Sequence, residues 1–122
     1  MQNDKSNFKK EFKKRLYNWV LNLIKFLDQL PKDGTTSIMS NQLLRSGTSI
    51  LANYVEAGAA SSRKDFINFY NHSLKSANES KVWLSLLKDT GRGDKDINIL
   101  LDELTEISNI IASSIITLKN KK

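Results

Sequence analysis

Few residues in this sequence could do acid–base or nucleophilic chemistry. His72 is the single histidine and there is no cysteine, which excludes thiol nucleophiles and zinc sites built on cysteine. Any nucleophilic serine would have only His72 as an activating base, which argues against a serine hydrolase. Glu56 and Glu79 could approach each other across a bundle of helices, but no metal-ligand pattern surrounds them. We therefore expect a protein that is not an enzyme and that holds neither a cofactor nor a metal.

Positive charge is the second chemical feature. The chain of 122 residues has 19 Lys and Arg against 13 Asp and Glu, a formal net charge of +6. Residues 1–30 contain seven basic and three acidic residues, and residues 61–92 contain six basic and three acidic residues. Basic helix faces bind phosphate backbones without reading sequence, although the same charge can serve solubility alone. The candidate nucleic-acid contacts are Lys9, Lys10, Lys13, Lys14, Arg15, Lys25, Lys119, Lys121 and Lys122.

The chain offers no sign of a membrane protein. Residues 1–15 are polar and cationic, without the apolar core of a secretory signal. The longest uncharged apolar run, residues 107–118, is too short to span a bilayer. We expect one domain over residues 1–122, a cytoplasmic location and no membrane partner.

Four helices must position the charged residues. Glycine and proline gather at residues 30–34, 58 and 90–94, which divides the chain into four segments. Each segment repeats apolar residues at steps of three and four, as an amphipathic helix does. Thr35, Thr36 or Ser37 is expected to cap the second helix. The third helix is expected to start at Ser61 or Ser62, and the fourth near Asp94 or Asp96. Because the connections are short, the sequence predicts an all-α fold, an antiparallel up-down-up-down four-helix bundle.

Core positions follow from the same spacing. The first helix is expected to bury Phe8, Phe12, Leu16, Trp19, Leu23, Phe26, Leu27 and Leu30. Gly47 lies within the apolar stripe of the second helix, which indicates close approach by a neighbouring helix. Five aliphatic residues fall away from these stripes: Ile24, Val82, Leu86, Ile99 and Ile110. They are either scattered surface residues or, as we expect, a second apolar face buried in a homo-oligomer.

A polar line runs along the second helix. Arg45, Ser49, Asn53 and Glu56 are separated by four, four and three residues, which places them on one face opposite the apolar stripe. Two interpretations stay open: local pairing along a solvated face, or a hydrogen-bonded line against another subunit or a ligand.

Three blocks of sequence carry a family resemblance. They are residues 45–57, with the pattern R-S-x-x-S-I-x-A-N-x-x-E, residues 62–66, ending in D-F, and residues 74–87, with E-x-x-x-W-L. Together they resemble a bacterial family of four-helix bundles. It includes the proteins encoded in intervening sequences of large-subunit ribosomal RNA genes, and the accessory variability determinants of diversity-generating retroelements. The positions that match as family motif or interface residues are Arg45, Ser49, Asn53, Glu56, Asp65, Glu79 and Trp83.

The resemblance implies a four-helix protomer and assembly of five protomers into a basic, barrel-like ring. For the retroelement members it also implies binding to nucleic acid and to a partner reverse transcriptase. The leading interpretation is therefore a homopentamer that binds RNA or DNA non-specifically through phosphate contacts. The alternative is a protein-interaction scaffold, for example for a reverse transcriptase, with no direct role in binding nucleic acid.

Overall fold

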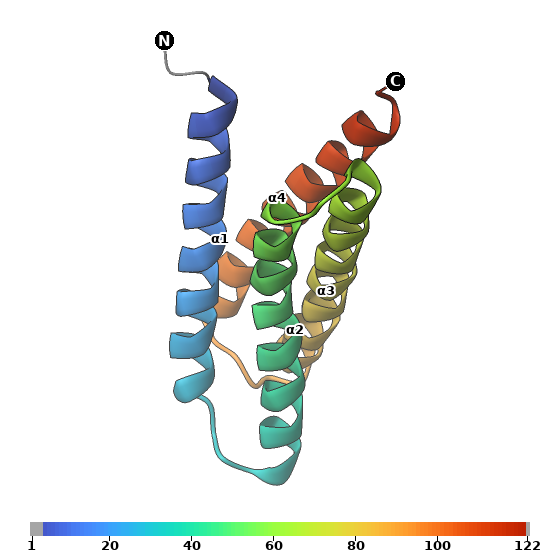
Figure 1. The fold of residues 1–122 in the computed structure, drawn as a ribbon. Helices are drawn as coiled ribbons and strands as arrows, with labels where there is room; N and C mark the ends of the chain where they lie inside the picture. Colours follow the sequence, from blue (N-terminus) through green and yellow to red (C-terminus); the bar gives the residue numbers. More distant parts are fainter. Residues whose placement is uncertain (1–3, 122) are drawn as a thin grey trace.

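The fold is a bundle of four long helices. The computed structural model describes the backbone of residues 4–121 and the side chains of residues 7–121. The helices are α1 (Asp4–Asp28), α2 (Gly34–Gly58), α3 (Arg63–Asp89) and α4 (Lys95–Lys119), and residues 4–121 contain no strand. Figure 1 shows each helix running opposite to the one before it, so that both chain ends lie at the same end of the bundle. The predicted all-α, up-down-up-down architecture is confirmed.

Short polar residues define where the helices begin. Ser62 caps α3 and Asp94 caps α4, each among the residues predicted for these positions. The prediction for α2 is wrong, since its N-cap is Asp33. The Asp33 carboxylate accepts bonds from the backbone N–H of Thr36 at 2.9 Å and from the Thr36 hydroxyl at 2.8 Å. One carboxylate thus satisfies two donors, one at each of its oxygens.

The C-terminal end of α3 is closed by a glycine turn. Gly91 has φ of 72°, a conformation that glycine adopts without steric cost. The N–H of Gly91 donates to the carbonyl oxygen of Lys88 at 3.0 Å, and the N–H of Arg92 to that of Leu87 at 2.8 Å. This pair of bonds is a Schellman motif, which ends the helix and turns the chain toward α4.

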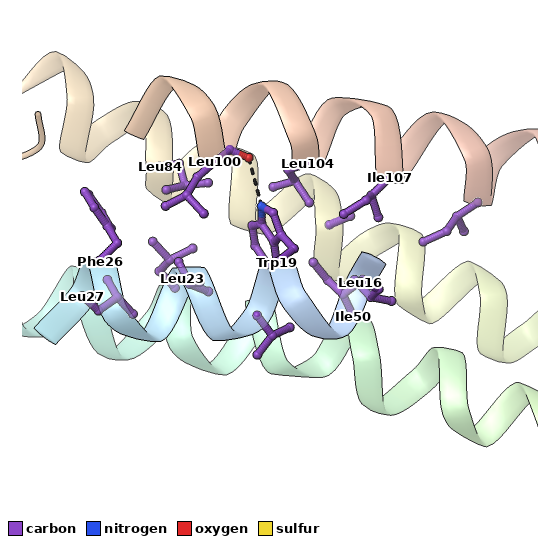
Figure 2. Packing of buried hydrophobic residues seen from close by; sticks show 14 of the residues in the cluster. Leu16, Trp19, Leu23, Phe26, Leu27, Ile50, Leu84, Leu100, Leu104 and Ile107 are labelled. Carbon is purple, nitrogen blue, oxygen red and sulfur yellow. Dashed lines mark hydrogen bonds between the residues drawn. The ribbon is translucent and has the colours of Figure 1, made fainter. Parts of the chain in front are cut away.

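The core draws on all four helices (Figure 2). Its largest fully buried side chains include Leu16, Trp19, Leu23, Leu43, Ile50, Leu84, Leu87, Ile97, Leu104, Ile107 and Ile111. Trp19 reaches from α1 to α4, where its indole Nε1 donates to the carbonyl oxygen of Leu100 at 3.0 Å. A methyl group at Gly47 would overlap Leu23 and lie 3.4 Å from Trp19. The predicted close approach to this glycine is confirmed, and the neighbour is α1.

Two predictions about apolar residues are wrong. Phe8, expected in the core, is 57% exposed, because the first turns of α1 lie away from α4 (Figure 1). Ile110, expected outside the core, is half-buried against it. The apolar stripe of α4 is wider than the stripe predicted from apolar residues at steps of three and four. The other four aliphatic residues, Ile24, Val82, Leu86 and Ile99, are exposed as predicted.

The four helix pairs differ in how closely they pack. Among neighbouring helices, α2 and α3 make the most extensive contact and α1 and α4 the least. Figure 1 shows α1 and α4 diverging toward the end that holds both chain termini, which we call the terminal end. Along the described part of the chain, no helix combines the length and apolar character needed to cross a membrane.

Candidate nucleic-acid interface

The middle of the polar line on α2 lies at the contact with α3. Ser49 is half-buried, and its Oγ accepts bonds from Ser76 Oγ at 2.9 Å and from Asn53 Nδ2 at 3.0 Å. Asn53 Nδ2 also donates to the carbonyl oxygen of Ser49 at 2.9 Å. Deeper in the same contact, the hydroxyls of Ser46 and Ser80 lie 2.7 Å apart. The line is therefore turned toward α3 rather than lying wholly opposite the apolar stripe.

The remaining motif residues lie at the surface around this contact. Arg45, Glu56 and Glu79 are exposed, and Trp83 is half-buried with its Nε1 donating to Glu79 Oε2 at 3.2 Å. Asp65 is exposed in the first turn of α3 and accepts a bond from Ser61 Oγ at 3.1 Å. The carboxylate lies at the positive end of the helix dipole, which stabilises it. Among these motif residues, Ser49, Asn53 and Asp65 thus have local structural roles.

The fold brings the two groups of candidate lysines together. Lys9, Lys10, Lys13 and Lys14 are exposed on the first half of α1. Lys119 in the last turn of α4 and Lys121 just after it, both exposed, lie at the same end of the bundle. Lys9 and Lys121 line one groove, although they are far apart in the sequence. Lys122 lies outside the described residues.

Two of the candidate basic residues, Lys25 and Arg15, differ from the lysines of the terminal end in their position or pairing. Lys25 is exposed toward the other end of α1 and lines a mixed-charge groove with Asp96 and Glu103. Arg15 donates through Nε and Nη2 to the carboxylate of Glu103, and its Nη2 also donates to Glu106 at 2.6 Å. These hydrogen bonds to Glu103 and Glu106 raise the pKa of the Arg15 guanidinium above its usual value. Arg15 therefore joins α1 to α4, and its charge is already neutralised by carboxylates.

The groove at the terminal end lies between α1 and α4 and has a volume of about 710 Å³. Aromatic rings from three helices form a connected series along it. Phe8 and Phe12 lie parallel with ring centres 6.5 Å apart, and Phe12 meets Tyr54 at 5.2 Å. Tyr54 and Tyr70 are 5.7 Å apart, and Phe66 lies 4.6 Å from Tyr70. The groove therefore has an aromatic surface with lysines at its edges.

The two tyrosines of this series add no negative charge to the groove. Burial raises the pKa of Tyr70, and the neighbouring Tyr54 raises it further. Burial also raises the pKa of Tyr54. Because the ordinary tyrosine pKa is already about 10, both hydroxyls are neutral at physiological pH. A polyanion at the groove would meet positive charge from lysines and no phenolate.

Spacing in the sequence did not predict this groove. Phe8, Tyr54, Phe66 and Tyr70 follow the spacing of core residues, so periodicity alone gives no reason to expect a groove at them. The sequence does carry one signal for the groove. These aromatic residues lie near the ends of their helical segments, and in an up-down-up-down bundle those ends meet at the terminal end. Arg63 was also missed: its Nη1 donates to the carbonyl oxygen of Lys121 at 2.9 Å, which places another cation beside the end of α4.

The described residues hold no group of three or more His, Cys, Asp or Glu side chains arranged to bind a metal ion. His72 is exposed on α3. The features with a chemical consequence are thus the lysines and the aromatic groove of the terminal end.

Comparison with known proteins places the chain in a family. The family described as 23S rRNA-intervening sequence protein matches residues 9–113. A crystal structure similar to this fold is that of a protein of unknown function from the S23 ribosomal protein family of Bacteroides thetaiotaomicron. It has a TM-score of 0.77 and 39% sequence identity, and the match covers 85% of this chain and 97% of that one. No curated protein matches the chain. The four-helix fold and the match over residues 9–113 show that the chain belongs to the 23S rRNA-intervening sequence protein family.

Proposed function

We propose that this protein binds nucleic acid non-specifically, through phosphate contacts made by lysines of the terminal end, and that it does so without catalysing a reaction. The observation that carries the proposal is the convergence of Lys9, Lys10, Lys13 and Lys14 with Lys119 and Lys121 at one end of the bundle. Lysine at the surface is a phosphate ligand that needs no particular base sequence.

Among the described side chains, no carboxylate forms an ion pair with these lysines. Among the residues whose side chains are described, the ion pairs within 4.0 Å both belong to Arg15. The lysine ammonium groups are therefore free to displace counterions from a phosphate backbone, which is the main source of non-specific affinity. The family name refers to 23S rRNA, so RNA is the first polyanion to test.

The test compares two variants of equal charge. Lys9→Gln, Lys13→Gln and Lys121→Gln together remove three charges from the terminal end. Lys32→Gln, Lys88→Gln and Lys95→Gln remove three exposed charges from the opposite end and serve as the control. We expect the first variant to bind RNA more weakly and with a smaller dependence on salt between about 50 and 200 mM, whereas the control stays near the unmodified protein. The absence of binding at low salt, or binding indifferent to salt, would contradict the proposal.

We also propose that the protein is a homo-oligomer, and by the family resemblance a ring of five chains. Tyr17, Leu21 and Ile24 are exposed on α1 at steps of four and three, so they share one face, and Val82 and Leu86 are exposed one turn apart on α3. Apolar faces of this kind are commonly buried between copies. Light scattering should give the mass of five chains at micromolar concentration, and the mass of one chain would contradict assembly. Several copies would also strengthen the field of the lysines.

A second candidate function is a scaffold for another protein, for example a reverse transcriptase. The exposed aliphatic residues favour it, as do Arg45 and Glu56 on α2, which form no ion pair with any side chain that the structure describes, because neither feature is needed to bind phosphate. Capture of partners from the native host, with and without nuclease, separates the two functions. A protein partner retained after nuclease treatment supports the scaffold, whereas partners lost with the nucleic acid support the first proposal.

A further inference from the structure

The groove of the terminal end differs from the other grooves in its chemistry. Its wall contains the aromatic side chains of Phe8, Phe12 and Phe66, and its charged lining residues are Lys9 and Lys121. None of its lining residues is acidic. The groove near the other end of the α1/α4 pair contains Asp96 and Glu103 beside its cations. Of these two grooves, only the one at the terminal end thus combines aromatic surface with unopposed positive charge.

A smaller hollow continues the same surface on the other side of α1. It has a volume of about 220 Å³ and shares Lys9, Tyr54, Phe66 and Tyr70 with the larger groove. Its further lining residues include Lys10 and Lys13, and again none is acidic. Glu56 and Asp65 lie toward the same end of the bundle but line neither hollow. Glu11 lines a third hollow, together with Phe8, Phe12 and Lys14. The aromatic surface is therefore flanked by lysines along both sides of α1.

Phe8 is the ring of this surface that is most available to a ligand. It is 57% exposed, whereas Phe12 and Tyr70 are buried. Its ring lies parallel to that of Phe12, with an interplanar angle of 8°. An exposed flat ring next to lysines is the arrangement with which proteins stack unpaired bases while holding the adjoining phosphates. In a duplex the bases are stacked on one another and offer no free face to such a ring.

We propose that the groove between α1 and α4 binds the unstacked bases of single-stranded nucleic acid. A base stacks on Phe8, and the neighbouring phosphates contact Lys9 on one side and Lys121 on the other. This inference rests on the proposed function and adds to it a preference for single strands over duplex. A peptide helix would fill the apolar part of the groove but would leave its lysines without partners, so the charge favours the polyanion.

The experiment separates base stacking from phosphate contact. Phe8→Ala removes the exposed ring, and Ile38→Ala removes an apolar side chain of similar exposure, 65%, from α2 outside the groove. The probes are oligothymidine, a duplex, and a strand of abasic phosphodiester. We expect Phe8→Ala to weaken binding of oligothymidine between about 5-fold and 150-fold, the range for one stacked base. Binding of the duplex and of the abasic strand should be unchanged, and Ile38→Ala should change none of the three.

Three results would overturn the inference. They are an equal loss for oligothymidine and duplex in Phe8→Ala, no loss for either, and a change of oligomeric state in Phe8→Ala, which would make the groove an interface between copies. The lysine variant Lys9→Gln, Lys13→Gln and Lys121→Gln distinguishes this failure from failure of the proposed function. If it still weakens binding of all three probes while Phe8→Ala has no effect, only the base-stacking inference is lost.

Discussion

The contact between α2 and α3 and the contact between α1 and α4 are built in opposite ways. The first is close and lined by small residues: Ser46 and Ser80 meet at 2.7 Å, and Ser73 Oγ donates to the carbonyl oxygen of Ile50 at 2.8 Å. The second is held by a few long side chains, Trp19 and Arg15, with open grooves between them. Small residues allow helix axes to approach, whereas aromatic and charged residues keep them apart.

The close contact between α2 and α3 holds the fold together, whereas the open contact between α1 and α4 carries the candidate binding residues. The family motif of α2 and its matching residues on α3 gather at or around the close contact, and several of them bond to one another. The exposed lysines and the aromatic groove lie at the open contact. The two contacts therefore predict different responses to substitution.

The largest effect is expected where volume is added to the close contact. Ala77 on α3 is fully buried, and Ala77→Leu has no space to fill, so it should lower the free energy of unfolding by about 3 kcal/mol. Thr117→Leu adds an apolar side chain at the open groove, where Thr117 is exposed, and should stay within about 0.5 kcal/mol. Urea unfolding of both variants measures the difference. Equal losses would contradict the distinction between the contacts.

Next in size is removal of the buried link between α1 and α4. Trp19→Phe deletes the hydrogen bond to the carbonyl oxygen of Leu100 and leaves a small cavity. We expect a loss of about 2 kcal/mol. Hydrogen exchange should show faster opening of α1 than of α3 in this variant, since α1 then retains little contact with α4. Uniform acceleration across all four helices would show that α1 is not the weakly held element.

A smaller effect is expected for the ion pair of the open contact. Arg15 and Glu103 are each about one third exposed, so solvent screens their attraction. Arg15→Gln should cost roughly 1 kcal/mol or less, and less at high salt. A double-mutant cycle with Glu103→Gln measures the coupling free energy between the two side chains. A coupling of zero at low salt would remove Arg15 from the account of how α1 is held.

The smallest effect concerns the cap of α2 at the end opposite the groove. The backbone N–H and then the hydroxyl of Thr36 hold the pKa of Asp33 below its usual value, which is about 3.9 in an unfolded chain. Because the pKa is lowered on folding, the stabilisation by the carboxylate is present above that value and is lost as pH falls through the folded pKa.

The variant Asp33→Asn keeps a side-chain acceptor without the titration. We expect its stability to fall less steeply than that of the unmodified protein between about pH 5 and pH 2. Asp28→Asn removes an exposed carboxylate outside the cap and serves as the control. Parallel curves of urea midpoint against pH for all three proteins would contradict the role of Asp33.

The helices and their order were predictable because each depends on local patterns. Apolar spacing gave four helices, and Ser62 and Asp94 are caps at predicted positions. Asp33, which precedes a glycine, was missed as the N-cap of α2 because three nearby hydroxyl residues, Thr35, Thr36 and Ser37, are also candidates for that position. Phe8 was wrongly predicted to be buried. Apolar spacing indicates which way a side chain points from its helix, but not whether another helix packs beside that turn.

The candidate site was predictable only in part, since it depends on contacts between helices. The candidate lysines are exposed, apart from Lys122, which is not described, and their contact with nucleic acid stays a prediction. Their convergence follows from the up-down-up-down order. The pairing of Arg15 with Glu103 and Glu106 depends on the rotation of α1 against α4, which periodicity within one helix does not determine. The orientation of Ser49 toward Ser76 likewise depends on how α2 is rotated against α3.

We propose above that the lysines of the terminal end bind nucleic acid by phosphate contact. The most direct test is the slope of log affinity for RNA against log salt concentration, for the unmodified protein and for Lys9→Gln, Lys13→Gln and Lys121→Gln together. We predict a steep slope that becomes shallower in the variant, by about 0.7 for each single-strand phosphate contact removed. The same slope in both proteins, or no binding at low salt, would contradict it.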